Sequence, residues 1–152
     1  MMDAPAPIDL APHRRSSGHR VLQRISPVAA RVHLTLALAI VLGVFVQVYL
    51  IGSYIFGAGQ GALDAHRTVG FTAHGLEVLI FVAAIVAWLP RGDLGLSLLL
   101  AVIGTVQVSL AGEHRWIGGL HPLLALLVLG LATTLAIRGM RRRRNAGLVR
   151  GN

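Results

Sequence analysis

Four long apolar stretches divide the chain, and short polar segments separate them. The stretches run near Ala29–Ser53, Ala65–Leu89, Leu94–Ala111 and Leu120–Ile137, of which the third is the shortest. A helix crosses the hydrocarbon core of a bilayer with about 20 predominantly apolar residues. The pattern therefore predicts four membrane-spanning helices and no sheet: an all-α, integral membrane four-helix bundle.

Residues typical of helix ends lie close to the limits of these stretches. Ser26 and Pro27 precede the first stretch, and Asp64 and Asp93 stand where a side chain can cap the second and third helices. Pro122 falls in the first turn of the fourth helix, where a missing N–H group costs little. The sequence thus predicts where each helix begins.

Composition agrees with a membrane protein. The 152 residues are 55% hydrophobic, with a mean hydropathy of +0.70. We expect residues 1–28 to form a flexible basic cytoplasmic tail, 29–138 the bundle, and 139–152 a second basic cytoplasmic tail. The chain has no cysteine, which excludes disulfides, Cys-ligated zinc and iron–sulfur clusters. All 14 basic residues are arginine, which together with the Ala, Gly, Leu and Val content suggests a high-GC bacterial source.

The net charge of +8 comes from arginines on one side of the predicted topology. All but two of the 14 basic residues lie before or close to the start of the first stretch, in the second connection, or after the fourth stretch. The other two, Arg67 and Arg115, lie on the opposite side beside Asp64 and Glu113. This is the positive-inside distribution. We therefore expect a multi-pass protein of the inner (plasma) membrane, with both termini cytoplasmic, lipid around it and no nucleic-acid partner.

The two halves of the chain repeat a short pattern. A Val-Gln-Val triplet centred on Gln47 leads through a polar loop to His66, which opens an apolar run. A second triplet, centred on Gln107, leads in the same way to His121. A Gly-Leu pair follows each histidine at the same distance. The pattern predicts two pseudo-repeated helical hairpins, each with a histidine near the start of its second helix.

The repeat would place His66 and His121 at the same depth, facing each other, which is the arrangement that a metal porphyrin needs. A small residue follows each histidine one turn later, Gly70 or Ala125, and would let a flat ring approach the helix backbone. Neutral imidazole is the usual axial ligand of haem b, and two imidazoles saturate the iron, which favours electron transfer. The alternative is that two half-solvated histidines cap two membrane helices.

Two further pairs of polar residues lie on the same side as the histidines. The guanidinium groups of Arg67 and Arg115 would pair with haem propionates in bidentate fashion, or with neighbouring acidic residues at the membrane interface. Gln47 and Gln107 lie in the outer halves of the first and third helices. Their amides would hydrogen-bond across helices or line the same cavity as the histidines.

Glu77 is the only carboxylate well inside an expected span. It follows His66 by eleven positions, on nearly the same helical face and about three turns deeper. His74 lies one turn before it, so the two side chains can share a proton. The pair is either structural or part of a proton-relay or quinone site. His33, near the cytoplasmic end of the first helix, is expected to cap the helix or reach the interface.

These motifs resemble one four-helix half of the haem A synthase family, over about residues 40–138. The resemblance rests on the pair His66-Arg67, on a glutamine-bearing third helix, and on the segment Gly119-Leu120-His121-Pro122-Leu123-Leu124-Ala125. The chain also resembles uncharacterised four-span membrane proteins of actinobacteria. Each half of haem A synthase places a histidine from its second and fourth helices on a haem. The resemblance therefore implies His66 and His121 as ligands of a haem.

The chain departs from that family in two respects. The family has a glutamate three residues before the first histidine, where this chain has Leu63 with Asp64 beside it. The chain also supplies one half rather than two. The resemblance thus supports haem binding more than hydroxylation of a haem.

Two function classes follow from the sequence. The first is a b-type haem-binding module for electron transfer or haem handling, acting with a membrane redox partner or within a larger membrane complex. The second is a non-catalytic four-helix accessory subunit or small transport component without cofactor. The sequence has no nucleophile–base–acid constellation and no phosphate loop, which disfavours a stand-alone hydrolytic or nucleotide-using enzyme.

Overall fold

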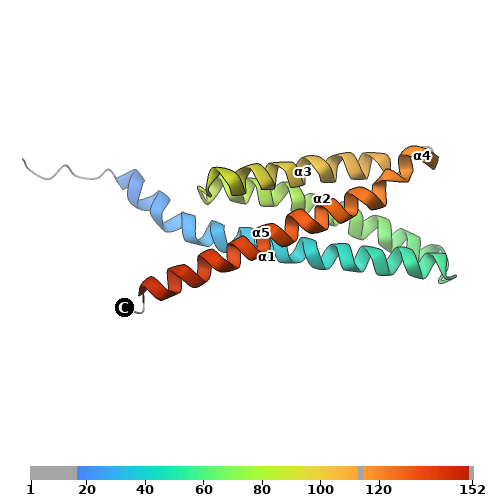
Figure 1. The fold of residues 1–152 in the computed structure, drawn as a ribbon, viewed down its shortest axis with the longest axis horizontal. Coiled ribbons are helices and arrows are strands. Elements are labelled where there is room, and N and C mark those ends of the chain that lie inside the picture. Colours follow the sequence, from blue (N-terminus) through green and yellow to red (C-terminus); the bar gives the residue numbers. More distant parts are fainter. Residues whose placement is uncertain (1–16, 113–114, 151–152) are drawn as a thin grey trace, which may run out of the picture.

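The computed structural model describes residues 17–112 and 115–150, and all regular elements in these ranges are helices. They are α1 (Ser17–Ile55), α2 (Gln60–Val86), α3 (Arg91–Leu110), the short α4 (Arg115–Gly118) and α5 (Leu120–Arg150) (Figure 1). The start of α1, the end of α5 and the α2–α3 connection lie at one end of the bundle. The α1–α2 connection and α4 lie at the other end (Figure 1).

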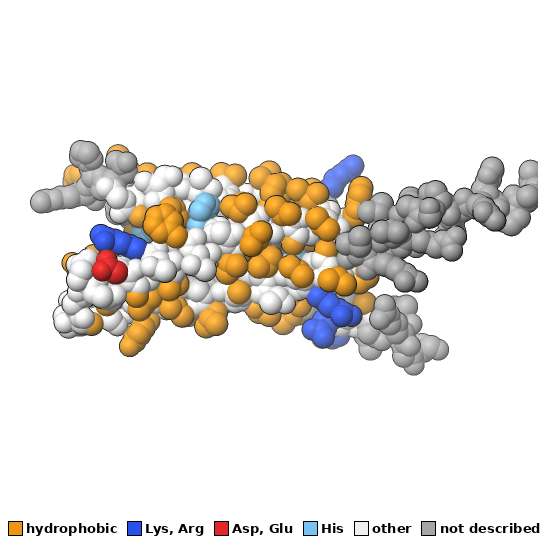
Figure 2. Space-filling model, turned by 180° about the vertical axis from the view of Figure 1, so that it is seen from behind, with side chains coloured by type: hydrophobic (Ala, Val, Ile, Leu, Met, Phe, Trp, Pro, Cys, Tyr) orange, Lys and Arg blue, Asp and Glu red, His pale blue; other side chains and the backbone are white. Residues whose placement is uncertain are grey.

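Four of these helices are long and apolar enough to cross a membrane. The membrane-spanning segments are Pro27–Ile55, Gln60–Val86, Arg91–Leu110 and Trp116–Ala146. Large apolar side chains such as Leu42 and Phe45 point outward, and hydrophobic side chains run along the visible face between arginines near its two ends (Figure 2). The predicted class is confirmed: the protein is an all-α, multi-pass four-helix bundle.

The first and last helices are longer than predicted. α1 begins at Ser17 rather than near Ala29, and Pro27 lies inside the helix instead of starting it. α5 continues to Arg150 rather than ending near Ile137. The physical reason for the longer α5 is that arginine has a high helix propensity and no proline interrupts the run, so the helix continues through Gly139 and Gly147. The expected tail residues 1–16 and 151–152 lie outside the described residues.

The connections also differ from the predicted caps. Gly57 and Gly59, with φ values of 94° and 82°, form the α1–α2 turn in a region that glycine adopts without steric penalty. Gly59 therefore occupies the N-cap of α2, and Asp64 lies within the helix. Pro90, not Asp93, is the N-cap residue of α3. Pro122 does fall in the first turn of α5, as predicted.

The helices pack in a ring around an apolar centre. α1 packs against α2 and α5, and α3 packs against the same two helices. Each helix contributes one large, fully buried side chain to a central layer made of Ile40, Ile80, Leu100 and Leu135. We call this set the central apolar layer. It separates the polar groups at the two ends of the bundle.

A buried ionic cluster joins α3 to α5 at the arginine-rich end. The Asp93 carboxylate is nearly inaccessible and pairs with Arg138 Nε at 2.7 Å and with Arg142. The Ser97 hydroxyl donates to the Asp93 carbonyl at 2.8 Å. It accepts a hydrogen bond from His33 Nε2 at 2.9 Å. We call these five residues the Asp93 cluster.

The cluster corrects two predictions. Asp93 is not a helix cap, because its carboxylate faces the arginines of α5 instead of the free N–H groups of α3. His33 neither caps α1 nor reaches the interface, because its side chain is completely buried against Ser97. Both polar groups find their partners inside the bundle, where water is not available to them.

Asp93→Asn is expected to lower the stability of the bundle by roughly 2–4 kcal/mol, because it leaves two partly buried guanidinium groups without their counter-charge. The measurement is reversible unfolding in detergent micelles. Asp64→Asn is the matched control. Asp64 pairs with Arg67 on the surface, where both side chains are 61% exposed, so its loss should cost less than about 1 kcal/mol. Equal effects of the two substitutions would contradict the role given to the Asp93 cluster.

Candidate functional site

The structure brings His66 and His121 together at the end of the bundle opposite the Asp93 cluster. His66 lies in the second turn of α2, and His121 is the second residue of α5. Their ring centroids are 6.3 Å apart and the ring planes are 73° from parallel. Two residues separated by more than fifty positions therefore meet, as the repeated pattern predicts. We call them the histidine pair.

The same backbone contact orients both imidazoles. His66 Nδ1 bonds to the carbonyl of Gln47 at 3.1 Å, and His121 Nδ1 bonds to the carbonyl of Gln107 at 3.0 Å. A carbonyl oxygen only accepts, so each Nδ1 carries the proton and each Nε2 keeps its lone pair. Among the described residues, neither Nε2 has a hydrogen-bond partner. The lone pairs of both rings are thus available to a ligand.

The contact also shows how the two hairpins correspond. In each one the first helix supplies the glutamine carbonyl and the second helix supplies the histidine. Gln107 lies in the last turn of α3, where carbonyl groups have no partner within the helix and accept bonds from elsewhere. α1 and α3 therefore have the same role in their hairpins: each supplies the backbone carbonyl that accepts a hydrogen bond from a histidine Nδ1.

The side chains of the two glutamines lie inside the bundle. Gln47 Nε2 donates to the carbonyl of His66 at 2.9 Å, which closes a reciprocal pair of bonds between α1 and α2. The Oε1 atoms of Gln47 and Gln107 are buried and have no hydrogen-bond partner in the described part of the chain. Such unpaired acceptors are rare in folded proteins and point to a donor that completes the site.

Gly70 has a role different from the predicted one. A Cβ atom added at Gly70 would lie 2.6 Å from Gln47 Nε2. The space above this glycine therefore holds the Gln47 amide and not a flat ring. Gly70 allows the Gln47–His66 contact to form.

The structure describes the side chain of one of the two predicted arginines, Arg67. Arg67 Nη1 lies 3.3 Å from Asp64 Oδ1, and both side chains are largely exposed. This is the interfacial pairing that was one of its two expected roles. Arg115 begins α4, and its side chain lies outside the described residues. Contacts of either arginine with a propionate remain predictions.

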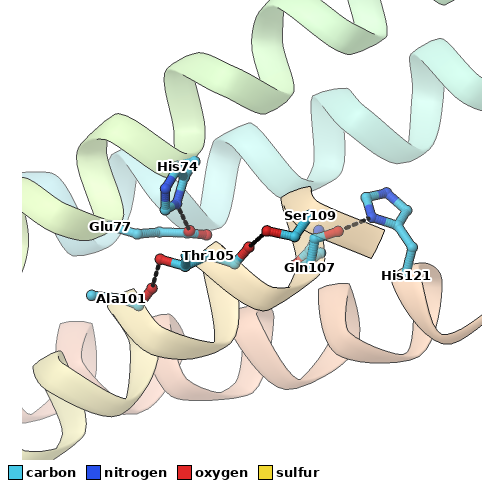
Figure 3. Close-up of polar contacts among 7 residues, drawn as sticks. All are labelled: His74, Glu77, Ala101, Thr105, Gln107, Ser109 and His121. Atoms are coloured by element: carbon cyan, nitrogen blue, oxygen red, sulfur yellow. Dashed lines mark hydrogen bonds and ion pairs between the residues drawn. The ribbon is translucent and has the colours of Figure 1, made fainter. Parts of the chain in front are cut away.

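His74 and Glu77 form the expected pair one turn apart on α2. His74 Nδ1 lies 3.2 Å from Glu77 Oε2, and the Glu77 side chain is 5% exposed. The carboxylate lies directly against α3 at Gly104, where an added Cβ would overlap it. Figure 3 shows the pair on α2 and, on α3, the polar side chains that lie between Glu77 and His121.

The Asp93 cluster was not singled out from the sequence. A signal was present, since Asp93 and Ser97 are four residues apart on α3 and Arg138 and Arg142 are four apart on α5. Residues with that spacing share a helical face. Nothing in the sequence, however, showed that these two faces meet.

The two imidazoles of the histidine pair suit a metal ion that already has other ligands. No group of three or more His, Cys, Asp or Glu side chains that could hold a metal ion occurs among the residues that the structure describes. The histidine pair offers two neutral nitrogens and no charged ligand. This set fits axial ligation of an iron held by a porphyrin better than a site for a free metal ion.

Comparisons of the chain with known proteins find no match. No family model matches the chain, and neither a curated protein nor a solved structure matches it significantly. The function must therefore be inferred from the residues and their geometry.

Proposed function

We propose that this protein binds haem b between His66 and His121 and serves in membrane electron transfer or haem handling. The observation that carries the proposal is the approach of two imidazoles, each with its Nδ1 held by a backbone carbonyl. This bond to a backbone carbonyl fixes the tautomer and raises the basicity of Nε2, as it does for most metal-ligating histidines. The same arrangement on both rings supports ligation by both.

The spacing of the rings supports ligation of one metal by both histidines. A metal–imidazole bond is about 2 Å long, so two imidazoles bound to the same ion would have their ring centroids about 5–6 Å apart. The observed centroid distance is 6.3 Å. The two rings are therefore close enough for both to hold one metal.

The residues around the pair would position the cofactor without reacting with it. Haem would supply a one-electron iron couple, and two axial imidazoles leave no open position for oxygen chemistry. The backbone carbonyls of Gln47 and Gln107 hold the rings. Arg67 and Arg115 would attract propionates to the end of the bundle where α2 and α5 begin.

The resemblance to one half of haem A synthase supports the same reading. In that family a histidine from the second and one from the fourth helix bind a haem, and α2 and α5 supply the corresponding residues here. The proposed redox partner is another membrane protein or a larger membrane complex, because a bis-histidine haem exchanges electrons without binding substrate.

The proposed setting is the inner (plasma) membrane, with both termini in the cytoplasm. The start of α1, the α2–α3 connection and the end of α5 lie at the same end of the bundle (Figure 1). Among the described residues, every arginine except Arg67 and Arg115 belongs to the segments at this end. The positive-inside rule therefore supports this end as the cytoplasmic one.

A reporter fused after Asn152 is expected to be active only when it is a cytoplasmic reporter, such as a folding-sensitive fluorescent protein. The same fusion with a reporter that requires export should be inactive. A matched insertion at Gly59, in the α1–α2 turn, should give the reverse pattern. Export-dependent activity from the C-terminal fusion would overturn the orientation.

Purified from haem-replete cells, the protein is expected to show the spectrum of a low-spin, bis-imidazole haem. His66→Ala and His121→Ala should each abolish or convert that spectrum, because loss of either ligand opens a coordination position. The control is His33→Gln, which changes a histidine in the Asp93 cluster at the other end of the bundle. It should leave the spectrum unchanged.

Two outcomes would contradict this assignment. A colourless wild-type protein would favour the accessory-subunit alternative, in which the histidine pair only joins helices. A low-spin spectrum that survives both alanine substitutions would show that haem binds elsewhere, with His74 as the next histidine to test.

A further inference from the structure

His74 and Glu77 are the only acidic or basic side chains between the histidine pair and the Asp93 cluster. The intervening parts of α1, α3 and α5 contain no Asp, Glu, Arg or His. An ionisable group in the hydrophobic core of a membrane protein is costly to bury, and such groups are commonly sites of proton or ion chemistry. The proposed function leaves this pair unused.

The geometry of the pair allows it to hold one proton or two. A single proton shared over the 3.2 Å contact between Nδ1 and Oε2 keeps the pair neutral, either as carboxylic acid and imidazole or as carboxylate and imidazolium. A second proton makes it cationic. Glu77 is buried, whereas the His74 side chain is 24% exposed. His74 is thus the more accessible of the two side chains.

The position of the carboxylate is determined by α3. An added Cβ at Gly104 would overlap both the Glu77 carboxyl carbon and its oxygens. Glycine at this position is therefore required for Glu77 to lie between α2 and α3 rather than toward lipid. The space that Gly104 leaves for the Glu77 carboxylate is a second observation in favour of a site at this pair, and it is independent of the contact with His74.

Few other charges act on the pair. α1 and α3 are the helices that pack against α2. On α1, Tyr49 and Tyr54 are exposed and His33 is bonded to Ser97 in the Asp93 cluster. On α3 the nearest ionisable group is Asp93, which already pairs with two arginines.

The remaining ionisable groups of α2 lie near its start. Asp64 and Arg67 pair with each other at the exposed end of the helix. His66 belongs to the histidine pair, and Glu77 follows it by eleven positions, about 16 Å along the helix axis at 1.5 Å per residue. Over that distance the electrostatic interaction between the histidine pair and Glu77 is only weakly screened, because no water or salt fills the apolar interior.

We propose that His74 and Glu77 form a proton-binding site that takes up a proton when the bis-histidine centre is reduced. A haem bound there would accept one electron from a one-electron donor, and His74 and Glu77 would bind one proton from water, so that charge is compensated inside the bundle. No other bond forms or breaks. This inference rests on the proposed function for its redox step and on the contacts above for its proton site.

The test is infrared difference spectroscopy of the purified protein, with dithionite as the electron donor. The reduced-minus-oxidised spectrum of the wild type is expected to contain a change in the C=O stretch of a protonated carboxyl group. Glu77→Gln should remove that signal, because glutamine keeps the shape and the hydrogen bond to His74 but binds no proton. Asp64→Asn, which changes an exposed carboxylate near the start of α2, should leave the signal unchanged.

A second measurement is the pH dependence of the reduction potential. In the wild type the potential should fall as pH rises, and Glu77→Gln should flatten this dependence while the low-spin spectrum stays the same. Gly104→Ala, which displaces the carboxylate without removing it, should weaken both effects. A carboxyl signal that persists in Glu77→Gln, or an equal pH dependence in wild type and variant, would overturn the proposal.

Failure of the proposed function can be told apart from failure of the proton site. A protein without haem overturns the haem assignment and with it the link to reduction. An infrared pH titration of that haem-free protein still decides whether Glu77 binds a proton. A titrating band that Glu77→Gln removes would support the proton site, and its absence would overturn that site too.

Discussion

Hydrocarbon offers no hydrogen-bond partner to a polar group, so the polar side chains within the bundle depend on contacts with other parts of the chain. Three groups of residues provide such contacts: the histidine pair with its glutamine carbonyls, the pair of His74 and Glu77, and the Asp93 cluster. Each joins two or more helices or places a polar group against a neighbouring helix. The central apolar layer lies between the last two groups. The positions of the helices relative to one another therefore depend on where these polar contacts form.

The histidine pair shows how a small repeat builds a site that neither hairpin contains alone. Each hairpin holds one imidazole through a glutamine carbonyl of its first helix. Packing the hairpins together then brings the two rings to 6.3 Å between centroids. Because the backbone and not a side chain accepts each Nδ1 bond, the orientation of the rings follows from helix packing. A ligand would meet rings that are already positioned, which reduces the ordering that binding requires.

Two glycines permit the polar contacts on α2 and α3. Gly70 makes room for the Gln47 amide, and Gly104 makes room for the Glu77 carboxylate. Small residues at helix interfaces allow close approach in membrane bundles generally, where packing and hydrogen bonds hold helices together. Here they receive polar side chains from the neighbouring helix. A larger residue at either glycine would displace the polar side chain, Gln47 or Glu77, before it pushed the helices apart.

The sequence by itself determined the number of spanning helices, the all-α class, the pairing of His74 with Glu77 and the equivalence of the two hairpins. These follow from local properties: the length of apolar runs, the spacing of residues along one helix and a pattern that occurs twice. Only the tertiary structure decided that Asp93 binds the arginines of α5, that His33 is buried against Ser97, and that Gly70 receives Gln47. A membrane helix is apolar on nearly all sides, so hydrophobic periodicity does not show which face meets a neighbour. The partners of its few polar residues become apparent only when the helices are packed.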